Sequence, residues 1–178
     1  MKIICLVKPV PDVERFVYDY ERNVLVRDNV HLVINPEDAT ALARALRIRQ
    51  NDPETIVETV TMAPRGAMPH IEDLLRRGVD RATLISDPLY VGSDTYATSR
   101  ILSRFLAGQE FNLLLCGTHT LDGGTAHVPL QVAELLNLPG IAGVTEVSDV
   151  TDAGDVAWTG RPGSLPGSRH EQLFGQTC

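Results

Sequence analysis

Residues 116–136, CGTHTLDGGTAHVPLQVAELL, have the residue types and spacing of an anion-binding turn. An apolar run that ends at Cys116 leads into a turn with Gly123 and Gly124, and this turn opens a helix. The first turn of a helix leaves backbone N–H groups without partners and carries the positive end of the helix dipole. The glycines let the backbone come close to a ligand. The segment therefore predicts a phosphate bound by the N–H groups of residues 125–128.

Other reactive residue types do not form a recognisable catalytic pattern. The sequence has no GxxxxGK[ST], GxSxG, HExxH or GxGxxG motif. His119 and His127 have no partner at ligand spacing apart from Cys116, so no metal site is expected. Cys116 lies in an apolar run, where a thiol's pKa is raised, and is expected to fill the core. We nominate no catalytic residue, and the P-loop, α/β-hydrolase, zincin and dinucleotide-fingerprint mechanisms lose support.

Alternating strands and helices must position the turn. Apolar runs at residues 3–7, 55–62, 82–85, 111–116 and 141–147 predict strands, and helices are expected at residues 36–50, 68–77, 95–107 and from the Gly-rich turn to about residue 138. The pattern is typical of an α/β fold with three layers, α/β/α, around a mainly parallel sheet of about five strands. Residues 18–34 contain two β-prone pieces, at 24–26 and 31–34, which suggest a hairpin excursion.

Ligands of such sheets bind beyond the carboxyl ends of the strands. This rule selects the loops after Val7, Ile34, Met62 and Cys116. An adenine or ribose could lie across the first and third of these loops while its phosphate meets the Gly-rich turn. Two residues each have two possible roles. Asn35 is either a helix N-cap or a ligand contact, and Asp122 either accepts hydrogen bonds from its own turn or contacts a ribose.

Composition limits the class of protein further. With 178 residues and 43% hydrophobic content the chain can form one full-sized core. A formal net charge of −7 and only 5% aromatic residues argue against a nucleic-acid surface. The three cysteines form no CxxC pair, and the N-terminal apolar run is too short for a signal peptide. We therefore expect a cytoplasmic protein without membrane insertion.

Five segments, in this order and at these spacings, resemble the β subunit of electron transfer flavoproteins over residues 1–150. They are IICLVKPVPD, LVINPEDATALARALRIR, RRGVDRATLISD, GSDTYATSRIL and LLLCGTHTLDGGTAHVPLQVAELLNLP. The resemblance implies an adenine-nucleotide-hydrolase-like fold that binds AMP, or a second FAD in the bifurcating type. It also implies a heterodimer with an α subunit that carries FAD, and a dehydrogenase or quinone reductase as redox partner. In that complex the protein would be an electron-carrier subunit and not an enzyme: it would position cofactors while the flavin does the redox chemistry.

The residues that the resemblance assigns to the nucleotide site lie on two strands, at the first long helix and around the Gly-rich turn. They are Leu6, Asn35, Met62, Gly117, Asp122, Gly123, Gly124, Thr125, Ala126, His127 and Val128. The phosphate would fall to the last four.

The chain departs from the family's pattern in two places. His127 stands where Gln is usual, and Thr118-His119 stands where many members have a basic residue followed by Gln or Arg, so AMP and FAD both remain open. Family members also continue into an arm that embraces the α subunit, and residues 151–178 are expected to be an irregular or truncated tail. Two other functions stay open: a free-standing nucleotide-binding module of the stress-protein kind, and a nucleotide-using transferase or hydrolase.

Overall fold

A four-stranded parallel sheet forms the centre of the computed structural model, which describes residues 1–12, 17–19, 24–26, 31–150 and 156–160. Its strands are β1 (Lys2–Leu6), β6 (Ile56–Met62), β7 (Arg81–Ile85) and β8 (Leu113–Cys116), in the order β7-β6-β1-β8. In register, Leu6 of β1 lies beside Val60 on one side and Cys116 on the other. Because all four strands are parallel, their carboxyl ends meet at one edge of the sheet.

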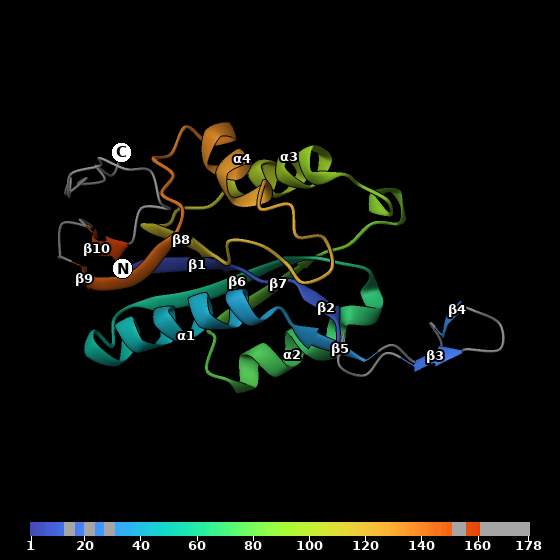
Figure 1. Cartoon of the computed structure of the whole chain (residues 1–178). Helices are drawn as coiled ribbons and strands as arrows, with labels where there is room; N and C mark the ends of the chain where they lie inside the picture. Colours follow the sequence, from blue (N-terminus) through green and yellow to red (C-terminus); the bar gives the residue numbers. More distant parts are fainter. Residues whose placement is uncertain (13–16, 20–23, 27–30, 151–155, 161–178) are drawn as a thin grey trace.

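Helices cover both faces of this sheet, which confirms the predicted three-layer α/β/α fold (Figure 1). On one face lie α1 (Pro36–Asn51) and α2 (Met68–Arg76), and on the other lie α3 (Thr95–Leu106) and α4 (Val128–Leu135). Two short 3-10 helices, η2 (Arg65–Ala67) and η3 (Pro88–Tyr90), precede α2 and α3. Asp94 caps α3, since its side chain accepts a hydrogen bond of 2.7 Å from the backbone N–H of Ala97.

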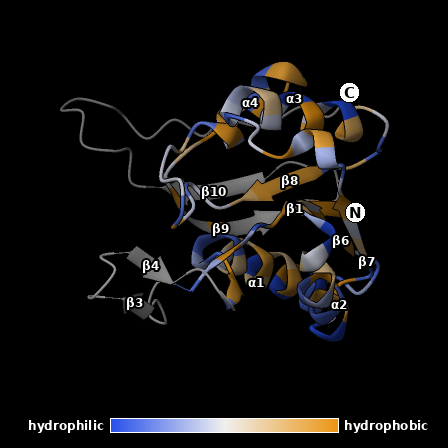
Figure 2. Cartoon of the chain, turned by 90° about the vertical axis from the view of Figure 1, so that its right-hand side faces the viewer, coloured by the Kyte–Doolittle hydropathy of each residue, from blue (hydrophilic) through white to orange (hydrophobic). Residues whose placement is uncertain are grey.

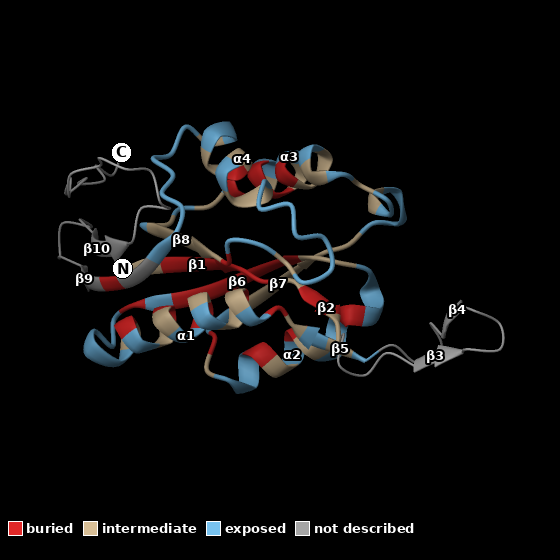
Figure 3. Ribbon diagram, viewed as in Figure 1, coloured by how far each residue is buried: buried red, intermediate tan, exposed pale blue. Residues whose placement is uncertain are grey.

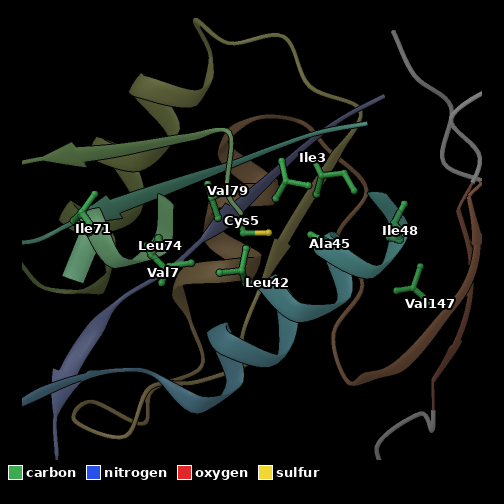
Figure 4. Close-up of a cluster of buried hydrophobic side chains, with 11 residues drawn as sticks. Ile3, Cys5, Val7, Leu42, Ala45, Ile48, Ile71, Leu74, Val79 and Val147 are labelled. Atoms are coloured by element: carbon green, nitrogen blue, oxygen red, sulfur yellow. The ribbon is translucent and has the colours of Figure 1, made fainter. Parts of the chain in front are cut away.

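The core has two parts, one on each side of the sheet. Ile3 and Cys5 of β1 face α1 and α2, where they join Leu42 and Leu74 in the cluster of Figure 4. The alternate residues Ile4 and Leu6 belong to the second cluster, which includes residues of α3 and α4. Both faces of β1 are therefore buried, as expected for the central strand of a covered sheet (Figure 3). The strand β8, also strongly hydrophobic, lies beside it (Figure 2).

The β excursion predicted near residues 18–34 is present, with strands at both predicted pieces, but these two pieces do not pair with each other as a hairpin. Instead β2 (Pro9–Pro11) pairs with β5 (Leu32–Ile34), and β3 (Val17–Asp19) pairs with β4 (Val24–Val26), both antiparallel. The chain leaves the sheet through β2 and β3 and returns through β4 and β5. The inner strands β3 and β4 therefore pair with each other, and the outer strands β2 and β5 pair with each other. The sequence reading missed β2 because its two prolines suggested a loop. The β3–β4 hairpin projects away from the sheet (Figure 1).

The expected fifth strand also differs. Residues 141–143 lie outside any strand, Gly143 has a φ of +73°, and β9 (Val144–Val150) pairs antiparallel with β10 (Val156–Gly160), not with the sheet. Part of the predicted irregular tail is thus a strand, while residues 151–155 and 161–178 lie outside the described residues. In the described part of the chain, no helix has the length and apolar character needed to cross a bilayer.

Candidate functional site

A cavity of about 510 Å³ lies at the carboxyl edge of the sheet. Each parallel strand contributes its end to the wall, through Leu6, Met62, Ile85 and Cys116. From β1 the chain proceeds to β6 and β7 on one side, and later adds β8 on the other side of β1. The cavity thus lies at the point where the strand order reverses, which is the usual ligand site of an open α/β sheet.

Eight of the eleven sequence-predicted site residues line this cavity, and the other three do not. The wall contains Leu6, Met62, Gly117, Gly123, Thr125, Ala126, His127 and Val128. Asn35, Asp122 and Gly124 are not among the lining residues. Asp122 and Gly124 belong to the loop that carries most of the others, and Asn35 is hydrogen-bonded to that loop.

Asn35 fastens the loop after β8 to the start of α1. It occupies the N-cap position, but its side chain makes no capping hydrogen bond. Its Nδ2 donates to the carbonyl oxygen of His119 at 2.9 Å, and its Oδ1 accepts from the N–H of Leu121 at 3.2 Å. The residue is 1% exposed, and the loop gives a partner to both polar atoms of this buried amide. Asn35 thus stands at the predicted N-cap position, but contacts with the loop replace the capping hydrogen bond of its side chain.

Glu37 and Asp38, in the first turn of α1, hold the same loop. The Glu37 carboxylate accepts a hydrogen bond of 2.9 Å from the backbone N–H of His119 and lies 2.9 Å from Nδ1 of that residue. The buried Asp38 carboxylate accepts from the backbone N–H groups of Gly117 at 3.0 Å and Lys8 at 2.9 Å. Carboxylates at a helix N-terminus are also stabilised by the helix dipole. One helical turn therefore joins the ends of β1 and β8.

Burial raises the pKa of the Asp38 carboxyl to about 6. The hydrogen bonds from Lys8, Asn35 and Gly117 act in the opposite direction, and the neighbouring charge of Glu37 adds to the increase. Folding therefore shifts the titration of this side chain towards neutral pH, while the carboxylate still predominates at pH 7.

This pKa predicts how stability depends on pH. Because the folded pKa lies above the unfolded one, the stabilising contribution is complete below the unfolded pKa and is lost as pH rises through about 6. Between pH 7 and pH 5, Asp38 should increase the free energy of unfolding by about 1 kcal/mol. We expect Asp38→Asn to remove this increase. Urea denaturation of both proteins at the two pH values measures it, and an equal pH dependence of both proteins would contradict the assignment.

The loop between β8 and α4 leaves a run of backbone donors unused. Its turn is closed by a hydrogen bond of 2.8 Å from Gly124 N–H to the Thr120 carbonyl, and Gly124 has a φ of +59°. Within the described residues, the N–H groups of residues 125–128 donate no hydrogen bond. Ala126 has a φ of +56°, a conformation that an L side chain rarely adopts. The segment is exposed (Figure 3), so these donors are available to an anion.

Asp122 forms an ion pair with Lys8, which lines the cavity. Nζ of Lys8 lies 2.6 Å from Oδ2 of Asp122. Partial burial opposes ionisation of this carboxyl, but hydrogen bonds from Lys8 and Thr120 and the Lys8 charge lower its pKa overall. Asp122 is thus an ionised acceptor that ties the loop to the end of β1.

The sequence reading missed the wall supplied by the segment between β7 and α3. Tyr90, Asp94 and Thr98 line the cavity there, and Asp87 accepts a hydrogen bond of 2.9 Å from Leu89 N–H within the same segment. The sequence-based prediction selects the loop after Ile34 and omits the loop after Ile85, but Ile34 ends a strand outside the main sheet. The signal was available, since the carboxyl end of β7 had to reach the same edge as the other parallel strands.

Cys116 has the properties of a core thiol. Burial, with a smaller effect from the Asp38 charge, raises its pKa to about 12, so the nucleophilic thiolate is not populated near neutral pH. Cys5 and Cys116 are both free thiols. Among the residues that the structure describes, no group of three or more His, Cys, Asp or Glu side chains could bind a metal ion.

The sequence is similar to known proteins of one family. The family model described as "Electron transfer flavoprotein domain" matches residues 22–159. The electron transfer flavoprotein subunit beta of Thermoanaerobacterium thermosaccharolyticum is 36% identical over 139 residues, which cover 78% of this chain and 53% of that protein.

Two further relatives have the same percentage identity to this chain. The caffeyl-CoA reductase-Etf complex subunit CarD of Acetobacterium woodii is 36% identical over 140 residues, which cover 78% of this chain and 53% of that protein. Protein FixA of Sinorhizobium fredii is 36% identical over 143 residues, which cover 78% of this chain and 50% of that protein. The chain thus spans about half the length of the curated relatives that it matches.

Proposed function

Because the chain belongs to the electron transfer flavoprotein β-subunit family, we propose that it binds an adenine nucleotide, AMP or FAD, and supports electron transfer as one subunit of a complex. One observation carries this proposal. The cavity at the strand-order reversal opens beside a loop whose backbone N–H groups at residues 125–128 have no acceptor among the described residues. Such a combination of apolar chamber and free amides suits a nucleoside that bears a phosphate.

The two ends of the cavity differ in a way that fits an adenylate. Its inner wall is apolar and includes Leu6, Val60 and Leu102, which can cover the flat faces of an adenine ring. The wall formed by the Gly-rich loop offers Thr125, Ala126 and His127, which can receive the phosphate. AMP and FAD share this adenylate half. When FAD is the bound group, its flavin ring supplies the redox chemistry.

The partners are proposed from the relatives. Relatives are named as electron transfer flavoprotein subunit beta, as a subunit of a caffeyl-CoA reductase-Etf complex and as an acryloyl-CoA reductase electron transfer subunit. For this chain we propose a heterodimer with an FAD-carrying α subunit, which exchanges electrons with a dehydrogenase or quinone reductase. The protein would then be an electron-carrier subunit and not an enzyme. The free thiols of Cys5 and Cys116 support a cytoplasmic location.

Nucleotide titrations test the proposal. We expect calorimetry to show one site for AMP or FAD on the purified chain, and a yellow protein would identify FAD as the natural ligand. If neither nucleotide binds, the proposed function is wrong. Stable self-association without binding to an added α subunit would favour a free-standing module. Turnover of ATP would favour a transferase or hydrolase.

A further inference from the structure

Lys8 differs from the other residues of the cavity wall in its charge. It is the only lysine or arginine among the described residues that line the cavity. Three carboxylates, those of Asp38, Asp87 and Asp94, line the same cavity. A phosphate group that enters this space meets negative charge from several directions, and the cavity provides one permanent cation to offset it.

The backbone of Lys8 is fixed by the first turn of α1. Its N–H donates to Oδ2 of Asp38 at 2.9 Å, and its carbonyl oxygen accepts from the N–H of Asn35 at 2.9 Å. These bonds determine where the side chain leaves the end of β1. The side chain is 44% exposed, so it reaches the cavity from a rigid base while its ammonium group stays accessible.

The ammonium group of Lys8 lies next to the loop that carries the free amides. Asp122, to which it is bonded at 2.6 Å, precedes Thr125 by three residues in that loop. An ammonium group has three N–H donors, and the bond to Asp122 uses one of them. Lys8 can therefore keep its bond to Asp122 and still donate to a second anion.

From this arrangement we propose that Lys8 is a binding residue for the phosphate of the nucleotide, acting together with the amides of residues 125–128. The inference rests on the proposed function and adds a specificity-determining side chain to it. Lys8 does not contact the nucleoside part in this assignment. The cavity should therefore distinguish a nucleoside monophosphate from its nucleoside through this one ammonium group as well as through the backbone.

Calorimetric titration of the full chain with AMP and with adenosine tests the role of Lys8. We expect Lys8→Met to weaken AMP binding by about tenfold or more, the usual scale for one charge-assisted hydrogen bond, and to leave adenosine binding unchanged. Lys8→Arg keeps the charge and should retain most of the AMP affinity. Lys2→Met is the matched control, because Lys2 starts β1, the strand that precedes Lys8, and pairs with Glu58 at 3.0 Å, outside the cavity lining. It should change neither affinity.

Each other outcome has a separate meaning. If Lys8→Met weakens AMP and adenosine equally, Lys8 is a structural residue and the inference is wrong. The inference is also wrong if AMP affinity is unchanged in that variant while the wild-type chain binds AMP. If the wild-type chain binds neither AMP nor FAD, the proposed function fails first and this inference fails with it.

Discussion

A Gly117→Ala variant is expected to lose about 3 kcal/mol of unfolding free energy and most of its nucleotide affinity. A Cβ at this position would lie 2.5 Å from Oδ1 of Asp38 and 2.7 Å from Cβ of Glu37. Real Cβ atoms do not approach other atoms so closely, so the loop or the helix must move. Such a movement breaks the hydrogen bond from Gly117 N–H to Asp38, which leaves a buried carboxylate with one partner fewer.

The residues around Gly117 cannot move without losing other hydrogen bonds. Asp38 cannot shift alone, because the same carboxylate accepts the backbone N–H of Lys8. Glu37 cannot shift alone either, because it accepts the backbone N–H of His119. Displacement of Gly117 thus disturbs the ends of β1 and β8 together, and with them the loop that we propose binds the phosphate.

Urea denaturation and AMP titration measure the two effects of Gly117→Ala. Gly66→Ala is the control, since Gly66 has no atom within 4 Å of an added Cβ and does not line the cavity. Its unfolding free energy should stay within about 0.5 kcal/mol of the wild type. A Gly117→Ala protein as stable as the Gly66→Ala control would show that the two elements are less closely packed than the structure indicates.

The periodic elements of the fold could be predicted because each has a local signal. Pro36 after Asn35, with acids in the next two positions, placed the start of α1, which begins at Pro36 in the structure. The apolar runs placed β1, β6, β7 and β8 to within one or two residues. Their alternation with helices then required a parallel sheet, and the position of the cavity followed from that sheet.

Pairings between distant segments could not be predicted in the same way. No local signal shows that Pro9–Pro11 pairs with Leu32–Ile34, because this depends on where the excursion returns. The burial of Asp38 also has no local signal in the sequence. Acidic residues in the first turn of a helix are usually exposed and favourable to the helix dipole. Asn35 gave the strongest N-cap signal in the chain, yet tertiary contacts with His119 and Leu121 use its side chain instead.

A Gly124→Val variant should bind AMP about a hundredfold more weakly than the wild type, with a smaller loss of stability of about 1–2 kcal/mol. An added Cβ at Gly124 meets no atom within 4 Å, so space is not the obstacle. The obstacle is the φ of +59°, which a β-branched residue strongly disfavours. Relaxation of this φ turns the following peptide groups, and the amides of Thr125 and Ala126 would no longer point to one phosphate. Two hydrogen bonds to an anion account for a loss of this size.

Gly78→Val is the control for Gly124→Val, because it introduces backbone strain at a position outside the Gly-rich turn. Gly78 also has a positive φ, +99°, but it follows α2 and does not line the cavity. Its substitution should reduce stability by a similar amount and leave AMP affinity unchanged, as thermal denaturation and calorimetry can show. If both valine variants bind AMP like the wild type, the phosphate is bound elsewhere in the cavity. If both lose affinity equally, the loss reflects global destabilisation, and the special role of the Gly-rich turn is wrong.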